Sequence, residues 1–359
     1  MLHGLAAATT ALVLTALLAA LLRTLTLRYG RTGHTTPHLG GVAVVLATLG
    51  VACAGPLLGV AELGEGVAPV LAAAGAVALL GLVGDLRPLG VRIRLGLRIR
   101  LVAQAGAATA VVTAAGLSPG AGALAVLWIV CVTNAFTFLD HCDGVMGAVA
   151  AVTALGLAVC AIAERRPGHG LLLSVLAAAL TGFLLHNWHP ARITIGDCGS
   201  LFTGFLLASC AVTVHAGEPG GRTGAELFAL TLVVLTDTLL VLVSRTRARR
   251  PLLRGGGDHI AHRLRRLGLS AQGSAVVLGV ATLGCTLIGL QIHDKRLAPV
   301  AALPLALMVA GAIVLLLRVP VYGPDARRRT PRARTPANPA ASSTSASTSA
   351  SIDIAGGRS

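Results

Sequence analysis

Long apolar runs separated by short polar segments make up most of the chain. Eleven such runs occur, at 2–22, 39–61, 67–84, 101–116, 121–139, 145–163, 170–187, 199–216, 224–244, 273–292 and 298–317. A hydrocarbon core about 30 Å thick needs about 20 apolar residues in a helix. The runs are continuous and do not alternate apolar with polar positions, as the strands of a membrane barrel would. We therefore predict an all-α, polytopic integral membrane protein with about eleven transmembrane helices.

The basic residues predict how these helices are oriented. Of the 29 Lys and Arg, 24 follow the odd-numbered runs and five follow the even-numbered runs. Lys and Arg collect in cytoplasmic loops of membrane proteins, so the N-terminus is predicted outside and the C-terminus in the cytoplasm. Arginines follow the first run, whereas the basic residues of a signal peptide precede its apolar stretch. This pattern favours a retained helix at the cell membrane.

Composition supports the membrane class. The chain is 55% hydrophobic and only 12% charged, whereas an average soluble domain carries roughly 25% charged residues. The net charge of +15 is explained by loop topology, and no nucleic-acid partner is expected. Seven cysteines without a C-x-x-C pair make disulfides and a structural zinc site unexpected.

The end of the chain differs in composition from the rest. Residues 324–359 are dominated by Pro, Ser, Thr, Ala and Arg, a mixture that cannot bury enough apolar surface to fold. We predict a membrane domain at 1–323 and a disordered, basic cytoplasmic tail at 324–359. Membrane lipid is the expected partner of the basic tail.

The acidic residues are scarce and unevenly placed. Six of the fourteen lie in cytoplasmic segments or at the inner ends of runs: Asp85, Asp140, Asp143, Asp197, Asp237 and Asp258. Ionisable residues in such a chain are costly and mark functional sites. Because the six come from five segments at one membrane depth, we predict an active site at the cytoplasmic face.

The segment 134–144 is the richest in polar residues. Asn134, Thr137 and Asp140 are spaced three apart and share one helical face. Asp143 stands one turn beyond Asp140, and two carboxylates this close repel unless a cation or a hydroxyl network lies between them. The alternative is a helix cap at the membrane boundary.

A second segment reads Gly196-Asp197-Cys-Gly199-Ser200 between two runs. The glycines allow close backbone approach, and free N–H groups at a helix start favour phosphate. Asp197 is suited to hold a divalent cation together with substrate oxygens. A turn with a capping aspartate is the alternative.

The longest cytoplasmic loop carries a third candidate site. His259 and His262 are three apart, with Arg263 beside them, and arginine and histidine both bind phosphate. Zinc is the rival ligand but would lack donors here, and positive-inside topology also explains the arginines. Asp237, within the ninth run, needs either a partner or a function.

These segments together resemble the polyprenyl-phosphate N-acetylhexosamine-1-phosphate transferases of glycosyltransferase family 4, the MraY/WecA-like group. The resemblance runs from about residue 34 to 275. It rests on the segments at 34–41, 84–88, 134–144, 190–200, 237–245 and 259–264. The order and the shared membrane side of all six make it specific.

The resemblance implies a function. Such enzymes transfer a sugar-1-phosphate, here by default that of N-acetylglucosamine, from a UDP-N-acetylhexosamine to undecaprenyl or decaprenyl phosphate. They release UMP at the cytoplasmic face and begin the synthesis of cell-envelope glycans or polysaccharides. Mg²⁺ is the implied cofactor, with Mn²⁺ as an alternative. A homodimer is one of the possible oligomeric states.

The resemblance also implies residue roles. Asp197 is the expected metal ligand, with Asp140 as a second candidate. The catalytic residues would be Asp85, Asp140, Asp143 and Asp197. The substrate-binding residues would be Asn134, Thr137, Gly196, Gly199, Ser200, His259, His262 and Arg263.

The chain departs from the family pattern at four positions. Gly84 replaces the first residue of an Asp-Asp pair, Thr137 replaces an Asn, His141 a Gly and Ala261 a His. A degenerate homologue that binds lipid or nucleotide without turnover is therefore an alternative. A transporter is a further alternative, although its polar residues would lie near the midplane.

Overall fold

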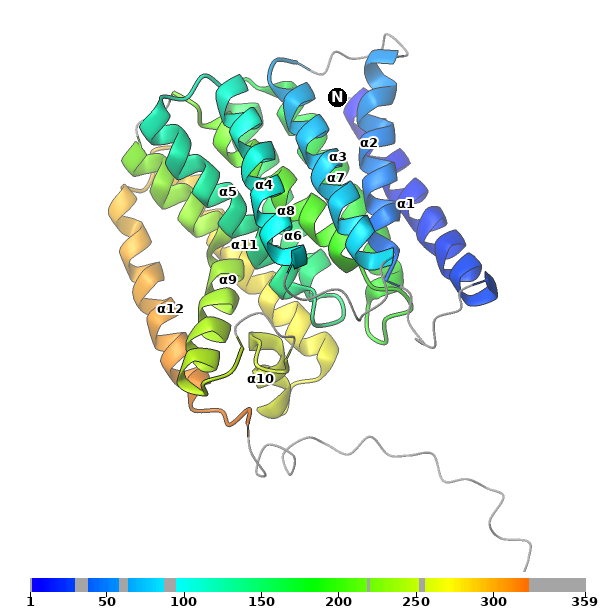
Figure 1. The fold of residues 1–359 in the computed structure, drawn as a ribbon. Coiled ribbons are helices and arrows are strands. Elements are labelled where there is room, and N and C mark those ends of the chain that lie inside the picture. Colours follow the sequence, from blue (N-terminus) through cyan, green and yellow to red (C-terminus); the bar gives the residue numbers. More distant parts are fainter. Residues whose placement is uncertain are drawn as a thin grey trace, which may run out of the picture.

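The computed structural model describes residues 2–29, 38–57, 64–86, 95–217, 220–251 and 256–322, and it contains helices but no strand in these ranges. Eleven long helices form the bundle: α1 (Leu2–Tyr29), α2 (Gly40–Leu57), α3 (Val67–Leu86), α4 (Leu95–Ala114), α5 (Pro119–Leu139), α6 (Val145–Ala163), α7 (Pro167–Asn187), α8 (Gly196–Val214), α9 (Gly220–Arg247), α11 (Ala271–His293) and α12 (Ala302–Leu317). Two short elements, α10 (Ile260–Arg266) and the 3₁₀ turn η1 (Pro299–Ala301), complete it (Figure 1). Within the described residues, each predicted apolar run overlaps one of the long helices, and the last run also includes η1. Residues 58–61 of the second run lie outside the described residues.

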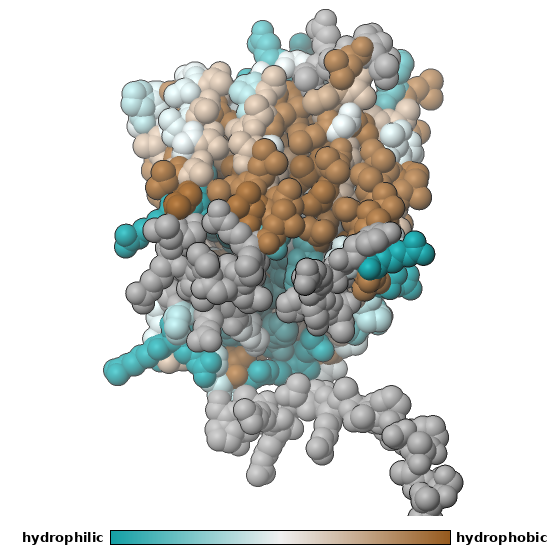
Figure 2. All heavy atoms as spheres, turned by 45° about the vertical axis from the view of Figure 1, so that its right-hand side comes forward, coloured by the Kyte–Doolittle hydropathy of each residue, from teal (hydrophilic) through white to brown (hydrophobic). Residues whose placement is uncertain are grey.

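The helices have the length and composition of a membrane protein. Within the described ranges, nine are long and apolar enough to cross a bilayer. The apolar stretch of α2 is shorter, and α4 carries Arg98 and Arg100 near its start. A broad apolar region covers much of the face shown in Figure 2, with hydrophilic residues below it. The predicted all-α polytopic membrane fold is thus confirmed, while the number of spans and their direction stay predictions.

The two ends of the bundle carry different polar groups. At the end where α10 lies, shown at the bottom of Figure 1, α3, α5, α7 and α9 finish and α4, α6, α8 and α11 begin. We call this the α10 end, and the opposite one the far end. The aspartates singled out in the sequence gather at the α10 end.

Close helix packing positions the start of α8. A Cβ added to Gly41 of α2 would lie 2.2 Å from the backbone N of Gly199, and one on Gly81 of α3 would lie 2.5 Å from the carbonyl O of Asp197. Small residues at such contacts let membrane helices approach closely. In addition, Gly41 N–H donates to the carbonyl of Ile195 at 2.8 Å. These contacts fix the first turn of α8, which carries Asp197.

The segment around α10 is tied to α9 and to the end of α12. Arg245 of α9 forms two hydrogen bonds to the Asp258 carboxylate, at 2.7 and 2.9 Å, and the Tyr322 hydroxyl donates a third at 2.8 Å. Burial by itself raises the pKa of Asp258, but these bonds from Arg245 and Tyr322 outweigh it and lower the pKa to about 2. The carboxylate therefore stays ionised at neutral pH and anchors the loop.

The predicted tail at 324–359 lies outside the described residues, and so does the boundary proposed at residue 323. Its expected disorder and cytoplasmic location stay predictions.

We expect the α10 end to face the cytoplasm, and a pair of single cysteines tests this. Leu267 is exposed at the α10 end, and Arg296 is exposed at the far end. In a background with the exposed Cys53 and Cys131 changed to serine, Arg296→Cys should react with an impermeant maleimide on intact cells. Leu267→Cys should react only after permeabilisation, because its loop lies on the strongly basic side. Rapid labelling of Leu267→Cys in intact cells would reverse the orientation.

Candidate active site

Four of the predicted aspartates form one electrostatic cluster at the α10 end. Asp85 stands near the end of α3, Asp140 and Asp143 lie in the turn between α5 and α6, and Asp197 lies in the first turn of α8. Burial and the charge of Asp197 raise the pKa of Asp140 well above its usual range, and Asp85 and Asp143 add to the rise. The site therefore holds an excess of negative charge that a cation would stabilise.

Asp85 has a defined structural role in this cluster. Its carboxylate accepts the backbone N–H of Asp197 at 3.0 Å and that of Cys198 at 2.9 Å. An anionic group at a helix N-terminus satisfies free N–H groups and complements the helix dipole. Two of the α8 N–H groups that the sequence analysis offered to phosphate, those of Asp197 and Cys198, are thus occupied by Asp85.

The glycines and serine of the same segment also serve packing. Gly196 has a φ of +70°, and an added Cβ would lie 2.8 Å from Asp85 Oδ2. Gly199 contacts Gly41 of α2, and Ser200 is fully buried inside the bundle. Their expected contact with substrate stays a prediction.

Asp197 pairs with an arginine that sequence reasoning did not single out. Arg100 Nη2 of α4 lies 2.5 Å from Asp197 Oδ2, and both side chains are partly exposed. A Cβ added to Gly84 would lie 3.2 Å from that same nitrogen and 3.3 Å from Asp197 Oδ2. Position 84, where the family carries a carboxylate, therefore adjoins this ion pair.

The donors around Asp197 fit a hard divalent cation. Mg²⁺ is commonly bound by one or two carboxylates together with substrate phosphates. Asp197 is partly exposed, and its charge acts on Asp140. These aspartates do not form a complete protein cage, since the group of three potential ligands within 4.8 Å in the described part lies at the far end. A site completed by substrate oxygens matches this arrangement.

Histidines line the other side of the α10 end. His259 Nδ1 lies 2.7 Å from Asp237 Oδ2, whose Oδ1 accepts the N–H of Ile260 at 2.7 Å. Asp237 thereby has the partner that its buried position required. The His141 ring stacks on His259 with centroids 4.5 Å apart, and the His262 ring lies 6.4 Å from it. His259 Nε2 is buried without a hydrogen-bond partner in the described part, whereas buried polar atoms usually have one.

A small cavity of about 60 Å³ opens beside these histidines. Its lining residues are His141, Cys142, Asp143, His189, Ala261, Arg265, Ala271 and Ser274. Asp143 Oδ2 holds His189 Nδ1 at 2.7 Å and accepts the N–H of Ala191 at 3.2 Å. Asp143 therefore orients the imidazole of His189 at this cavity.

Arg263 points away from the cavity. Its guanidinium donates to the Ser244 hydroxyl at 2.6 Å and to three carbonyls, those of Asp258, Leu316 and Val319. It is fully buried, so the expected phosphate contact is corrected to a structural role. Arg265, two residues later, lines the cavity instead.

Asn134 and Thr137 lie on α5, deeper in the bundle than Asp140. Asn134 donates to Gln104 of α4 at 2.7 Å and to the Val130 carbonyl, while the Thr137 hydroxyl bonds to Thr133 of its own helix. The structure thus places both on α5, which ends directly before Asp140. Their contact with a nucleotide or sugar stays a prediction.

Asn187 also supports the site. Its amide accepts Gly144 N–H and donates to the Ile193 carbonyl, both at 2.9 Å. The loop after α7 is thereby joined to the start of α6, next to Asp143. A polar residue at the end of an apolar run was the only sequence signal for it.

Comparison with known proteins gives a consistent picture. Residues 67–215 match glycosyl transferase family 4. A provisionally named glycosyltransferase of Streptomyces coelicolor is 52% identical over 344 residues, which covers 93% of this chain and 82% of that protein. A Bacillus subtilis protein named as an undecaprenyl-phosphate N-acetylglucosaminyl 1-phosphate transferase is 33% identical over 43% of each chain. The decaprenyl-phosphate N-acetylglucosaminephosphotransferase of Mycolicibacterium smegmatis is 32% identical over 55% of this chain. The chain spans about half, or less, of these two named transferases.

Proposed function

Because the chain belongs to glycosyl transferase family 4, in its MraY/WecA-like group, we propose that it transfers N-acetylhexosamine-1-phosphate from a UDP-sugar to polyprenyl phosphate and releases UMP. The observation that carries the proposal is the gathering of Asp85, Asp140, Asp143 and Asp197 beside His259 at one end of the bundle. N-acetylglucosamine is the default sugar, as in the names of two relatives. We place the reaction at the cytoplasmic face, as the first step of an envelope glycan.

We assign different residues to metal binding and to phosphate binding, the two tasks of a phosphoryl transfer. This reaction depends on positioning and charge neutralisation more than on covalent chemistry. Asp197, with Asp140 beside it, would hold Mg²⁺, which neutralises charge on the diphosphate when bound. The guanidinium of Arg265 lines the cavity and is suited to hold phosphate oxygens. We propose that His259 Nε2, which has no hydrogen-bond partner in the described part, also contacts the phosphate.

The absence of a carboxylate at position 84 does not imply that the protein is inactive. A phosphomonoester has a second pKa of about 6 and is mostly dianionic at pH 7, so the acceptor needs little help to lose a proton. The partner of the family's pair, Asp85, is kept as the cap of α8. The clustering of the polar groups at one end also differs from the midplane site of a transporter.

The proposal is tested with purified protein, polyprenyl phosphate, Mg²⁺ and a panel of UDP-sugars. We expect UMP release that requires both the lipid phosphate and Mg²⁺, greatest with UDP-N-acetylglucosamine. Release of UDP would indicate transfer of the sugar without its phosphate. Absence of UMP with every sugar would favour the non-catalytic alternative, and unchanged substrate crossing sealed vesicles would favour a transporter.

Gly84→Asp should raise the transfer rate. A carboxylate at this position would lie beside Arg100 and compete for it with Asp197, which would leave Asp197 freer to bind Mg²⁺. A general base contributes about 10²–10⁴-fold, and we expect a gain at or below the lower limit because the acceptor is already mostly ionised. The gain should increase at acidic pH, where more acceptor is protonated.

The matched control is Gly84→Asn, which adds nearly the same volume without the charge. Rates are compared across pH 6 to 8 and across Mg²⁺ concentrations. If Gly84→Asp and Gly84→Asn slow the enzyme equally, the added bulk is responsible and the carboxylate at this position is dispensable.

A further inference from the structure

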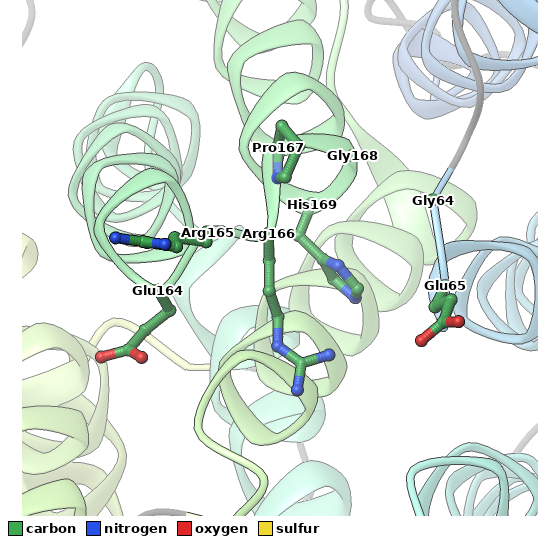
Figure 3. A pocket seen from close by; sticks show the side chains of 8 residues that line it. All are labelled: Gly64, Glu65, Glu164, Arg165, Arg166, Pro167, Gly168 and His169. Atoms are coloured by element: carbon green, nitrogen blue, oxygen red, sulfur yellow. The ribbon is translucent and has the colours of Figure 1, made fainter.

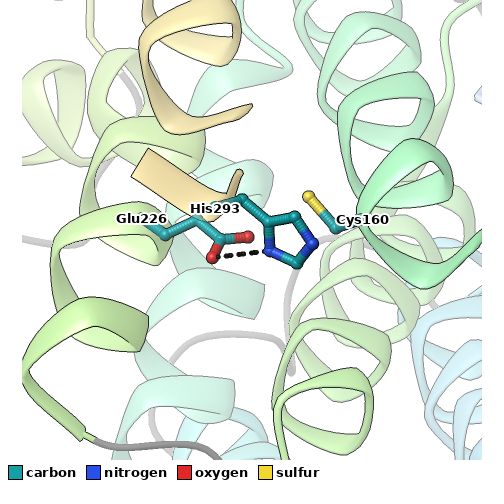
Figure 4. A group of neighbouring side chains, drawn as sticks. All are labelled: Cys160, Glu226 and His293. Carbon is teal, nitrogen blue, oxygen red and sulfur yellow. Dashed lines mark hydrogen bonds and ion pairs between the residues drawn. The ribbon is translucent and has the colours of Figure 1, made fainter. Parts of the chain in front are cut away.

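A second group of metal-type donors lies at the far end, away from the aspartates. Cys160 of α6, Glu226 of α9 and His293 of α11 each offer one ligand atom, and these atoms all lie within 4.8 Å of one another (Figure 4). Cys160 and Glu226 are buried, and His293 Nδ1 lies 3.1 Å from Glu226 Oε2. Three different helices thus direct a thiol, a carboxylate and an imidazole to one point.

Neighbouring residues orient two of these three donors. His293 Nε2 faces Glu164 Oε1 at 3.5 Å, so the other ring nitrogen, Nδ1, is the one presented to the group. Glu226 Oε1 lies 2.8 Å from His215 Nε2, and His215 Nδ1 lies 2.7 Å from the Ala211 carbonyl. In metal sites, the second ring N–H of a histidine ligand donates to a carboxylate or carbonyl, and ligating carboxylates are themselves hydrogen-bonded. The outer contacts of this group follow that arrangement.

The donor chemistry selects the class of metal. Thiolate and imidazole are ligands for zinc and its transition-metal neighbours, whereas Mg²⁺ requires oxygen donors. Zn²⁺ with one thiolate, one carboxylate and one neutral imidazole carries no net charge, which suits a buried position. Zinc sites with three protein ligands keep a fourth position for water.

Glu164 connects the group with a cavity at the far end. A cavity of about 390 Å³ at the far end is lined by Gly64, Glu65, Glu164, Arg165, Arg166, Pro167, Gly168 and His169 (Figure 3). Glu164 is one-third exposed and lies on the side of the cavity away from Glu65. It contacts both this cavity and His293, so an ion entering from the far side meets a carboxylate before it reaches the buried donors.

We propose that Cys160, Glu226 and His293 form a zinc-binding site at the far end, with His215 and Glu164 as outer positioning residues. Binding exchanges the Cys160 thiol proton and the His293 Nδ1 proton for the ion, with release of both to solvent. The site joins α6, α9 and α11, and it is independent of the transferase chemistry proposed for the other end.

The test uses full-length protein without a histidine tag, washed with chelator, loaded with Zn²⁺ and desalted. We expect one zinc per chain by mass spectrometry. With Co²⁺ as the probe, we expect a thiolate-to-cobalt charge-transfer band together with the visible bands of a tetrahedral ion. Glu164→Gln should weaken affinity by about 10–100-fold, as the loss of an outer partner does in other sites.

Two conservative variants and two controls decide the outcome. Cys160→Ser should remove the charge-transfer band, and His293→Gln should lower retained zinc to near zero, while Cys53→Ser on α2 should leave both unchanged. His262→Gln tests the histidines of the α10 end and should also keep the zinc. The proposal is overturned if the wild type retains no stoichiometric zinc, if Cys160→Ser keeps the band, or if His262→Gln loses the metal.

Discussion

Asp197→Asn is expected to reduce transfer by at least about 10³-fold while leaving the protein folded. Loss of one preorganised charge-stabilising group typically costs about 10²–10³-fold, and here the same carboxylate would also hold the metal. The fold should tolerate the change, because the α8 start is capped by Asp85 through backbone N–H groups that the substitution keeps. The ion pair with Arg100 is partly exposed, so its loss costs little stability.

The measurement is UMP release at several Mg²⁺ concentrations, with thermal unfolding in detergent as the folding check. Asp294→Asn is the matched control, since Asp294 is an exposed aspartate at the far end, and its rate should equal that of the wild type. Retained activity in Asp197→Asn with the same Mg²⁺ requirement would show that the metal binds elsewhere.

Arg263→Ala is expected to destabilise the protein by about 3 to 5 kcal/mol. The guanidinium is fully buried and bridges α9, the loop before α10 and the end of α12 through four hydrogen bonds. Its removal leaves several buried acceptors unsatisfied, and each of these costs about 1–3 kcal/mol. Arg263→Lys should rescue only part of this, because an ammonium cannot reproduce the planar fork of donors.

Arg265→Ala is the matched comparison. Arg265 lines the cavity beside His141 and Asp143, so its loss should raise the KM for the UDP-sugar and leave the unfolding temperature close to that of the wild type. An Arg263→Ala protein with wild-type stability and a raised KM would instead restore the phosphate contact inferred from the sequence.

The helices could be predicted from the sequence because the length of an apolar run and the basic residues beside it are local properties. Within the described residues each predicted run overlaps a long helix, and scarce aspartates at one depth identified the cluster at the α10 end. The role of Asp85 as the cap of α8 could not be predicted in this way. It depends on a contact between residues 85 and 197 that only the packing of α3 against α8 creates.

The orientation of Arg263 shows a limit of helical spacing. Its guanidinium partners Ser244, Leu316 and Val319 belong to α9 and to the end of α12, so contacts between segments distant in the sequence decide where it points. The ion pair of Arg100 with Asp197 was not predicted for another reason. Arginines near a cytoplasmic loop are expected from topology alone, so Arg100 did not stand out. The donors at the far end, Cys160, Glu226 and His293, are too distant in sequence to form any motif.

The central claim is that the sugar moves together with its phosphate onto the lipid. The direct measurement uses UDP-N-acetylglucosamine labelled both in the sugar and in the β-phosphate, incubated with polyprenyl phosphate, Mg²⁺ and the purified protein. We predict that both labels enter the lipid fraction in equal amounts, matched by UMP. Sugar label alone in the lipid with release of UDP, or neither label there under conditions in which the protein is folded, would contradict the account.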